Sequence, residues 1–339
     1  MKLARTLQIL LLAATLSLAG IAAAQSVAPI VIKFSQVADS DTPRGQAALR
    51  FKQLVDQNSG GRLRVDVYPN GVLYRESDEL EALQLGAVQM LAPSLAKLAL
   101  FGVREFEVFD LPYLFTDMRS VERVTQGLVG KNLLKKLDAK GMVGLAYWSG
   151  GFKVMSANQP ITMPNDFVGL RMRIHASRVL DMEMAALGAT PLTIDAAEVH
   201  AALEKGLADG TESTLADFRA RRWDEVQSNI TLSDHGYVGY AVVVNKRFWE
   251  SLSTDLRKII EDALAEATTY GNALAARENS AALEWLKKSD HVVVHVQTPA
   301  ERAAWRQALQ PVVRDLQARL DNGIVAATEN AAEGRWRRR

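Results

Sequence analysis

The chain contains no cysteine among its 339 residues. This absence excludes disulfide bonds, thiolate metal ligands, a cysteine nucleophile and lipid attachment at a processed N-terminus. The sequence also lacks the HExxH, GxSxG, GxxxxGK(S/T) and GxGxxG motifs, which carry zinc, acyl-transfer, phosphate and dinucleotide chemistry. We therefore expect a protein that is not an enzyme, needs no cofactor and holds no metal, and whose stability comes from ordinary packing.

An excess of charge of one sign is absent too. The 40 Lys and Arg residues nearly balance the 39 Asp and Glu residues, and the formal net charge is +1. This balance predicts no nucleic-acid partner. The arginine-rich segment Arg335–Arg339 is interpreted as a frayed end.

Residues 1–24 have the pattern of an export signal. Lys2 and Arg5 precede an apolar run from Leu7 to Leu18, and small residues end at Ala24. Polar residues dilute the run below the roughly 20 apolar residues of a membrane anchor, so we predict cleavage after Ala24 and a periplasmic location. The remaining 315 residues exceed what one hydrophobic core usually organises, and two lobes are expected.

The first part of the mature chain alternates between strand and helix patterns. The pattern predicts a strand at 30–34, a helix from Thr42-Pro43 to 58, a strand at 62–68, a helix at 77–85 and a strand at 88–92. This order favours a largely parallel sheet covered by helices. Ligands of such sheets bind beyond the carboxyl ends of the strands, where Gln36 and Ser94 lie.

The rest of the chain predicts a second lobe and a return to the first. Expected features are a strand at 143–147, a flexible crossing at 148–151, a strand at 172–174, a helix capped by Asp195, a turn at Asp209-Gly210, a strand at 240–244, a helix at 255–288 that spans both lobes, and a helix from Thr298 that Pro311 kinks or splits. The lobes would comprise residues 25–150 with 239–278, and 151–238 with 279–339.

Few residues suggest metal or acid–base chemistry. His291 and His295 flank a strand-like run, where this spacing separates side chains by roughly 13 Å and prevents a shared metal site. Asp209 and Glu212 lie beside a glycine, and we attribute the glycine to turn geometry and the Asp to backbone capping. No further acidic residues follow at the spacing of a calcium loop.

Two cations at the start of the second lobe are more informative. Lys153 follows the glycine crossing, and alternation places Arg171 and Arg173 on one face of a strand. In a central strand Arg173 must be paired or must face a cleft, because an unpaired buried guanidinium is costly. Its planar fork suits a carboxylate.

Several stretches, in order over nearly the whole mature chain, resemble the solute-binding proteins of tripartite ATP-independent periplasmic (TRAP) transporters of the DctP type. They are Ile32–Ser35 with Asp41–Gly45, Leu91–Lys97, Phe109–Phe115, Gly169–Arg173, Ala186–Pro191, Glu198–Val199 with Ala202–Leu203, Asp209–Glu212, Asp234–Tyr237 and Asn245–Trp249. The resemblance implies an α/β periplasmic binding protein fold of two lobes, with hinge strands and a long lobe-spanning helix, that closes on its ligand.

The resemblance also implies a site and partners. Arg173 takes the position of the carboxylate-clamping arginine and Lys153 that of the basic residue after the hinge. The full predicted ligand-binding set is Arg173, Lys153, Ser94, Lys97, Gln36, Ser213 and Tyr237. Ser213 and Leu215 stand where the family commonly has Asn and Trp, which leaves the ligand open.

Within the family, the residues of these motifs are most similar to those of binders of C4-dicarboxylates. The resemblance implies that the bound dicarboxylate would be delivered to the membrane subunits of a TRAP transporter. The alternatives are a sensory module for a carboxylate, and an enzyme acting on an organic acid with Asp209, Glu212 or His235 as acid or base.

Overall fold

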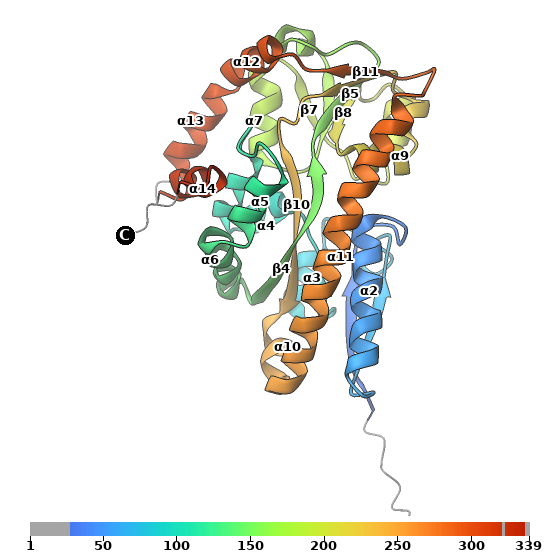
Figure 1. Ribbon diagram of the computed structural model, residues 1–339, viewed down its shortest axis with the longest axis vertical. Helices are drawn as coiled ribbons and strands as arrows, with labels where there is room; N and C mark the ends of the chain where they lie inside the picture. The colour runs from blue at the N-terminus through green and yellow to red at the C-terminus, as the bar shows by residue number, and fades with distance from the viewer. Residues whose placement is uncertain (1–27, 321–322, 336–339) are drawn as a thin grey trace, which may run out of the picture.

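A computed structural model describes residues 28–320 and 323–335 of the protein. The predicted signal peptide and the last four residues of the arginine-rich segment lie outside these ranges. The described chain is a mixed α/β structure with two sheets, as the sequence predicts (Figure 1). No described helix is both long enough and apolar enough to cross a bilayer.

The first lobe is built on a five-stranded sheet in the order β2-β1-β3-β10-β4. Strand β1 is parallel to β2 and β3, whereas β10 is antiparallel to β3 and β4. The predicted parallel arrangement therefore holds for the first three strands, and the returning strand makes the sheet mixed. The strands are β1 (Ile30–Ser35), β2 (Leu63–Tyr68), β3 (Met90–Leu91), β4 (Met142–Phe152) and β10 (Tyr237–Asn245).

The second lobe is built on a six-stranded sheet in the order β11-β9-β5-β8-β6-β7. Strand β6 is parallel to β7 and β8, and β5 is antiparallel to β8 and β9. The strands are β5 (Val154–Ala157), β6 (Arg171–Ile174), β7 (Thr190–Thr193), β8 (Gly210–Ser213), β9 (Asn229–Leu232) and β11 (Val293–Val296). The exact residue ranges proposed for the lobes stay a prediction.

The helices start and stop largely where caps were predicted. The Thr42 side chain accepts a hydrogen bond from the Gly45 amide and caps α2, and Gly86 ends α3 with a φ of 79°. The α-helices are α2 (Pro43–Asn58), α3 (Glu79–Leu85), α4 (Leu95–Leu100), α5 (Met118–Thr125), α6 (Leu128–Lys136), α7 (Arg178–Ala186), α8 (Val199–Glu204), α9 (Leu215–Ala220), α10 (Lys246–Ser251), α11 (Thr254–Leu286), α12 (Pro299–Ala308), α13 (Gln310–Arg319) and α14 (Ile324–Ala332). Short 3-10 helices are η1 (Arg104–Asp110), η2 (Leu137–Lys140), η3 (Pro164–Phe167) and η4 (Trp223–Glu225).

Two local predictions in the second lobe are wrong. Helix α8 begins at Val199, and Asp195 instead accepts a backbone hydrogen bond from Glu198 at 2.8 Å in the turn that precedes it. Gly210 does not form a turn but opens strand β8. A Cβ at this position would lie 2.3 Å from the backbone oxygen of Ser156 on β5, so the glycine is needed for close strand packing.

The crossing between the sheets also lies later than predicted. Gly150 and Gly151 belong to β4, which pairs with β10 as far as Phe152. The chain changes sheet at Lys153, whose amide donates to the carbonyl of Gly236 in the returning crossing, at 2.9 Å. The two crossings are thus joined to each other by a hydrogen bond.

Helix α11 runs along both lobes and confirms the predicted spanning helix (Figure 1). Its first half buries Leu256 and Ile260 in the core of α2 and the five-stranded sheet. Its second half buries Ala282 and Leu286 in the core of α8, α9 and the six-stranded sheet. One continuous helix therefore contributes to two separate hydrophobic cores.

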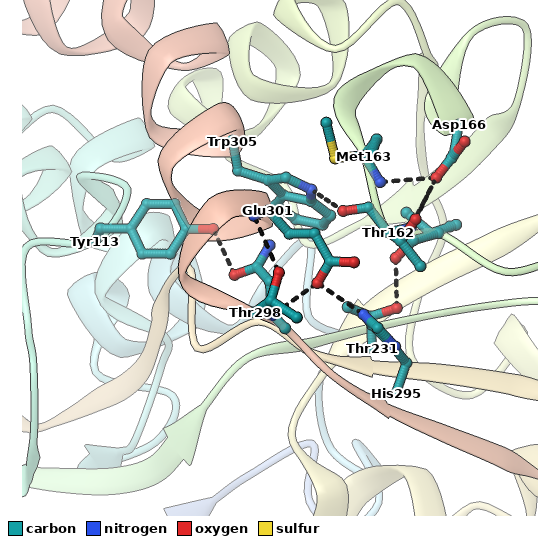
Figure 2. Close-up of polar contacts among 11 residues, drawn as sticks. Tyr113, Thr162, Met163, Asp166, Thr231, His295, Thr298, Glu301 and Trp305 are labelled. Carbon is teal, nitrogen blue, oxygen red and sulfur yellow. Dashed lines mark hydrogen bonds and ion pairs between the residues drawn. The ribbon is translucent and has the colours of Figure 1, made fainter.

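The chain ends in three helices, and Pro311 lies in the first turn of α13, where the predicted split occurs. Figure 2 shows the polar contacts at the start of α12. Thr298 and Glu301 form a capping box, and the Glu301 carboxylate also lies 2.9 Å from His295. Among the described residues no group of His, Asp and Glu has the arrangement of a metal site.

Candidate ligand-binding site

A cavity of about 80 Å³ lies between the two lobes. Arg44, Ser94 and Tyr240 line it from the first lobe, and Arg173, Ser213 and Arg221 from the second. Since a buried water needs about 10–15 Å³, the cavity has room for about five to eight water-sized groups. That is the size of a small organic acid.

Arg173 faces this cavity from strand β6. Its side chain is fully buried, with the residue 1% exposed, and its Nε donates to the carbonyl of Ile194 at 3.0 Å. No described carboxylate lies within the 4.0 Å of an ion pair with it, and its Nη1 has no hydrogen-bond partner. Burial lowers the pKa of the guanidinium, which shows how poorly its charge is compensated.

Other polar atoms around the cavity lack partners as well. Arg44 Nε, His175 Nε2 and Trp223 Nε1 are buried, line the cavity and make no hydrogen bond. Burial also lowers the pKa of His175 well below its usual value, so its ring is neutral. Because buried polar groups are normally satisfied, this concentration of unpaired groups fits a polar ligand.

Lys153 lines the cavity but already has an anionic partner. Its Nζ lies 2.9 Å from a carboxylate oxygen of Glu212, and both residues are buried. Burial alone would raise the pKa of Glu212, but the Lys153 ammonium holds it well below the usual range. The two cations expected to bind a diacid are therefore not equivalent, because Lys153 is compensated within the protein.

Two more buried acids, Asp110 and Glu183, interact electrostatically with Lys153. Asp110 accepts a hydrogen bond from Ser177 Oγ at 2.7 Å, and neither carboxyl oxygen of Glu183 has a hydrogen-bond partner. Burial raises the pKa of both groups, although Lys153 opposes the shift. The Lys153 ammonium thus interacts electrostatically with three buried carboxyl groups.

The other predicted site residues divide into two groups. Ser94, Ser213 and Tyr237 line the cavity, as do Lys153 and Arg173. Gln36 and Lys97 are not among its lining residues. Gln36 is buried, and Lys97 pairs with Glu79 at 3.0 Å. Ligand contact by any of the seven stays a prediction.

The residues considered as an acid or base do not line the cavity either. Asp209 accepts from the backbone amide and the guanidinium of Arg171, and this contact lowers its pKa. Its predicted backbone role therefore includes an ion pair that the sequence did not indicate. His235 contacts Ser233 Oγ through Nδ1 at 2.7 Å.

Arg44 and Arg221 were missed by the sequence analysis. Arg44 Nη1 donates to the carbonyl of Ala92 at 3.0 Å, and Arg221 Nη1 donates to that of Ala196 at 3.2 Å. The segment that contains Arg44 was noted as a family motif, which was the available signal. Nothing in the sequence around Arg221 indicates a shared cavity.

Residues 34–320 match the family described as bacterial extracellular solute-binding protein, family 7. This chain belongs to that family. The predicted resemblance to TRAP solute-binding proteins of the DctP type is confirmed, since the solved relatives include such proteins at high structural similarity.

Two curated relatives of this family 7 protein are C4-dicarboxylate-binding periplasmic proteins DctP. The protein from Rhodobacter capsulatus is 51% identical over 303 residues, which cover 89% of this chain and 91% of that one. The protein from Shewanella loihica is 40% identical over 300 residues, covering 88% and 89%.

Two solved TRAP periplasmic solute-binding proteins carry diacids. One from Shewanella oneidensis, with bound succinate, has a TM-score of 0.87 and 40% identity, over 90% of this chain and 100% of that one. One from Pseudomonas aeruginosa, with bound L-malate, has a TM-score of 0.81 and 36% identity, over 85% and 100%.

Proposed function

We propose that this protein binds a C4-dicarboxylate reversibly between its lobes and delivers it to the membrane subunits of a TRAP transporter. The mature protein would begin after Ala24 and act in the periplasm. Binding is the end point, and no bond of the ligand is made or broken.

This proposal depends on the burial of Arg173 and on its lack of a carboxylate partner among the described residues. A fully buried guanidinium with a free Nη1 and no carboxylate partner among the described residues is costly unless an anion joins it. A carboxylate can accept two parallel hydrogen bonds from a guanidinium, which fixes its orientation as well as its charge. The succinate and malate in the related structures support the choice of a four-carbon diacid.

The binding role is also supported by what surrounds the cavity. The acids Asp209 and Glu212 are engaged by Arg171 and Lys153, and neither lines the cavity. An acid or base would need to reach the reacting atoms of the ligand. The enzymatic alternative that uses Asp209 or Glu212 as acid or base is therefore disfavoured.

Isothermal titration calorimetry of residues 25–339 with succinate, fumarate and malate tests the proposal. We expect Arg173→Ala to weaken binding at least ~100-fold, because charged hydrogen bonds contribute about 1.5–3 kcal/mol each. Arg171→Ala is the matched control, since Arg171 lies two positions earlier on β6 and is paired with Asp209 at 2.6 Å. Near-normal affinity of Arg173→Ala would remove Arg173 from the site, and no heat with any diacid would reject the ligand class.

A further inference from the structure

Three arginines around the cavity are held in the same way. Each guanidinium donates to a backbone carbonyl: Arg173 to Ile194 at 3.0 Å, Arg221 to Ala196 at 3.2 Å and Arg44 to Ala92 at 3.0 Å. None has a described carboxylate within 4.0 Å. A carbonyl orients a guanidinium but does not cancel its charge, so all three remain available to an anion.

Some arginines elsewhere in the described chain are paired with acids, and others, such as Arg123 and Arg257, donate to backbone carbonyls away from the cavity. Examples of the pairs are Arg50–Glu266, Arg62–Asp255, Arg171–Asp209 and Arg319–Glu107. Lys153 is likewise neutralised by Glu212. Three guanidinium groups without a carboxylate partner thus line one cavity.

Two of the three arginines belong to one side of the cavity. Arg173 and Arg221 donate to backbone carbonyls that are only two residues apart, in the loop between β7 and α8. Both therefore move with the second lobe.

Arg44 lies on the other side, in the first turn of α2. This helix packs against β2, β4 and α11 of the first lobe (Figure 1). The Arg44 guanidinium lies 4.0 Å from the ring centroid of Tyr240 on β10, and its buried Nε has no partner. It is thus fixed in place with an unused donor.

None of the acids that line the cavity forms an ion pair with Arg44. Glu79 pairs with Lys97, Asp110 accepts from Ser177, and Asp217 accepts from Ser213 at 3.3 Å. Glu76, the remaining lining acid, is beyond ion-pair distance of Arg44.

We propose that Arg44 binds the second carboxylate of the ligand, so that a diacid joins the two lobes with one carboxylate on each. This inference rests on the proposed function and replaces Lys153 by Arg44 as the second cationic anchor. A ligand with one carboxylate would then form an ion pair with an arginine of only one lobe.

The test compares succinate with succinamate, in which a neutral amide of similar shape replaces one carboxylate. The wild-type protein should prefer succinate, and Arg44→Gln should reduce this preference about 10- to 100-fold while affecting succinamate little. Arg44→Lys should keep most of the preference, because it keeps the charge. Arg50→Gln is the matched control on the same helix, since Arg50 is paired with Glu266, and it should change neither affinity.

Three results would separate the hypotheses. An unchanged preference for succinate over succinamate in Arg44→Gln overturns the inference. If Arg221→Gln abolishes that preference and Arg44→Gln does not, both carboxylate anchors lie on the second lobe, which overturns the inference too. A wild-type protein that binds no diacid rejects the proposed function instead. If urea unfolding shows that Arg44→Gln is not folded, Arg44→Met takes its place, and an unchanged preference in that folded variant overturns the inference.

Discussion

The carboxyl group of Glu183 illustrates how much a single buried residue can set the response to pH. It shares the surroundings of Lys153 with Asp110 and Glu212, and Lys153 forms its close ion pair with Glu212 alone. Burial therefore raises the pKa of Glu183 well above its usual value. The folded protein keeps a proton that the unfolded chain releases near pH 4.3.

This difference has a definite sign. Where the folded state binds more protons than the unfolded state, the free energy of unfolding falls as pH rises, here from about pH 4 upward. Glu183→Gln removes this contribution. Relative to wild type, the variant should gain stability as the pH rises above about 4, as measured by urea unfolding at a series of pH values. Asp110 contributes with the same sign but is present in both proteins and cancels. The exposed Glu204→Gln serves as control, and a difference independent of pH would contradict the prediction.

Among the helices, α11 is tied to strand β4 and to the second lobe by one side chain. Asn279 Nδ2 donates to the carbonyl of Gly150 at 2.8 Å, and its Oδ1 accepts from the amide of Ala216 at 3.1 Å. Asn279→Ala should lower the free energy of unfolding by about 2 kcal/mol, since two backbone groups lose their partner. Ser280→Ala is the control on the next residue, because Ser280 bonds only within its own helix, to Ala276. Equal denaturation midpoints for both variants would show that the contact is not stabilising.

Helices and strands could be predicted from the sequence where residues close in the chain set their ends. Helix ends at Thr42, Thr298 and Pro311 depend on residues a few positions apart, so local patterns sufficed. Gly210 was misread because Asp-Gly is a local turn signal, whereas its glycine is required by a strand more than fifty residues away in sequence. The lobes and the spanning helix followed from length and periodicity.

The candidate site was predictable only in part, for the same reason. Arg173 was identified because an arginine in a central strand must be paired or face a cleft, and because the family resemblance places the carboxylate-clamping arginine at this position. That Glu212 compensates Lys153, and that Arg44 and Arg221 do not meet an acid, are facts about distant segments. Sequence spacing carries no information on such pairings.

For the whole molecule, the buried guanidinium of Arg173 predicts a change of shape. Without an anion, opening of the lobes would hydrate its charge, whereas a bound diacid would compensate it in the closed form. Small-angle scattering should therefore give a smaller radius of gyration with saturating succinate than without it. In the absence of succinate, Arg173→Met should have a smaller radius of gyration than the wild-type protein, because no buried charge then opposes closure of the empty lobes. Identical curves for the wild-type protein with and without succinate would contradict the prediction.

The joined crossings at Lys153 and Gly236 have a consequence for the conditions under which such a protein works. Dissolved ions cannot reach the Lys153–Glu212 pair, because both side chains are shielded from solvent. An arginine in an open cleft is surrounded by those ions. We therefore expect ionic strength to change the rate at which a charged ligand reaches the cavity and to leave the ion pair beside the crossings unaffected.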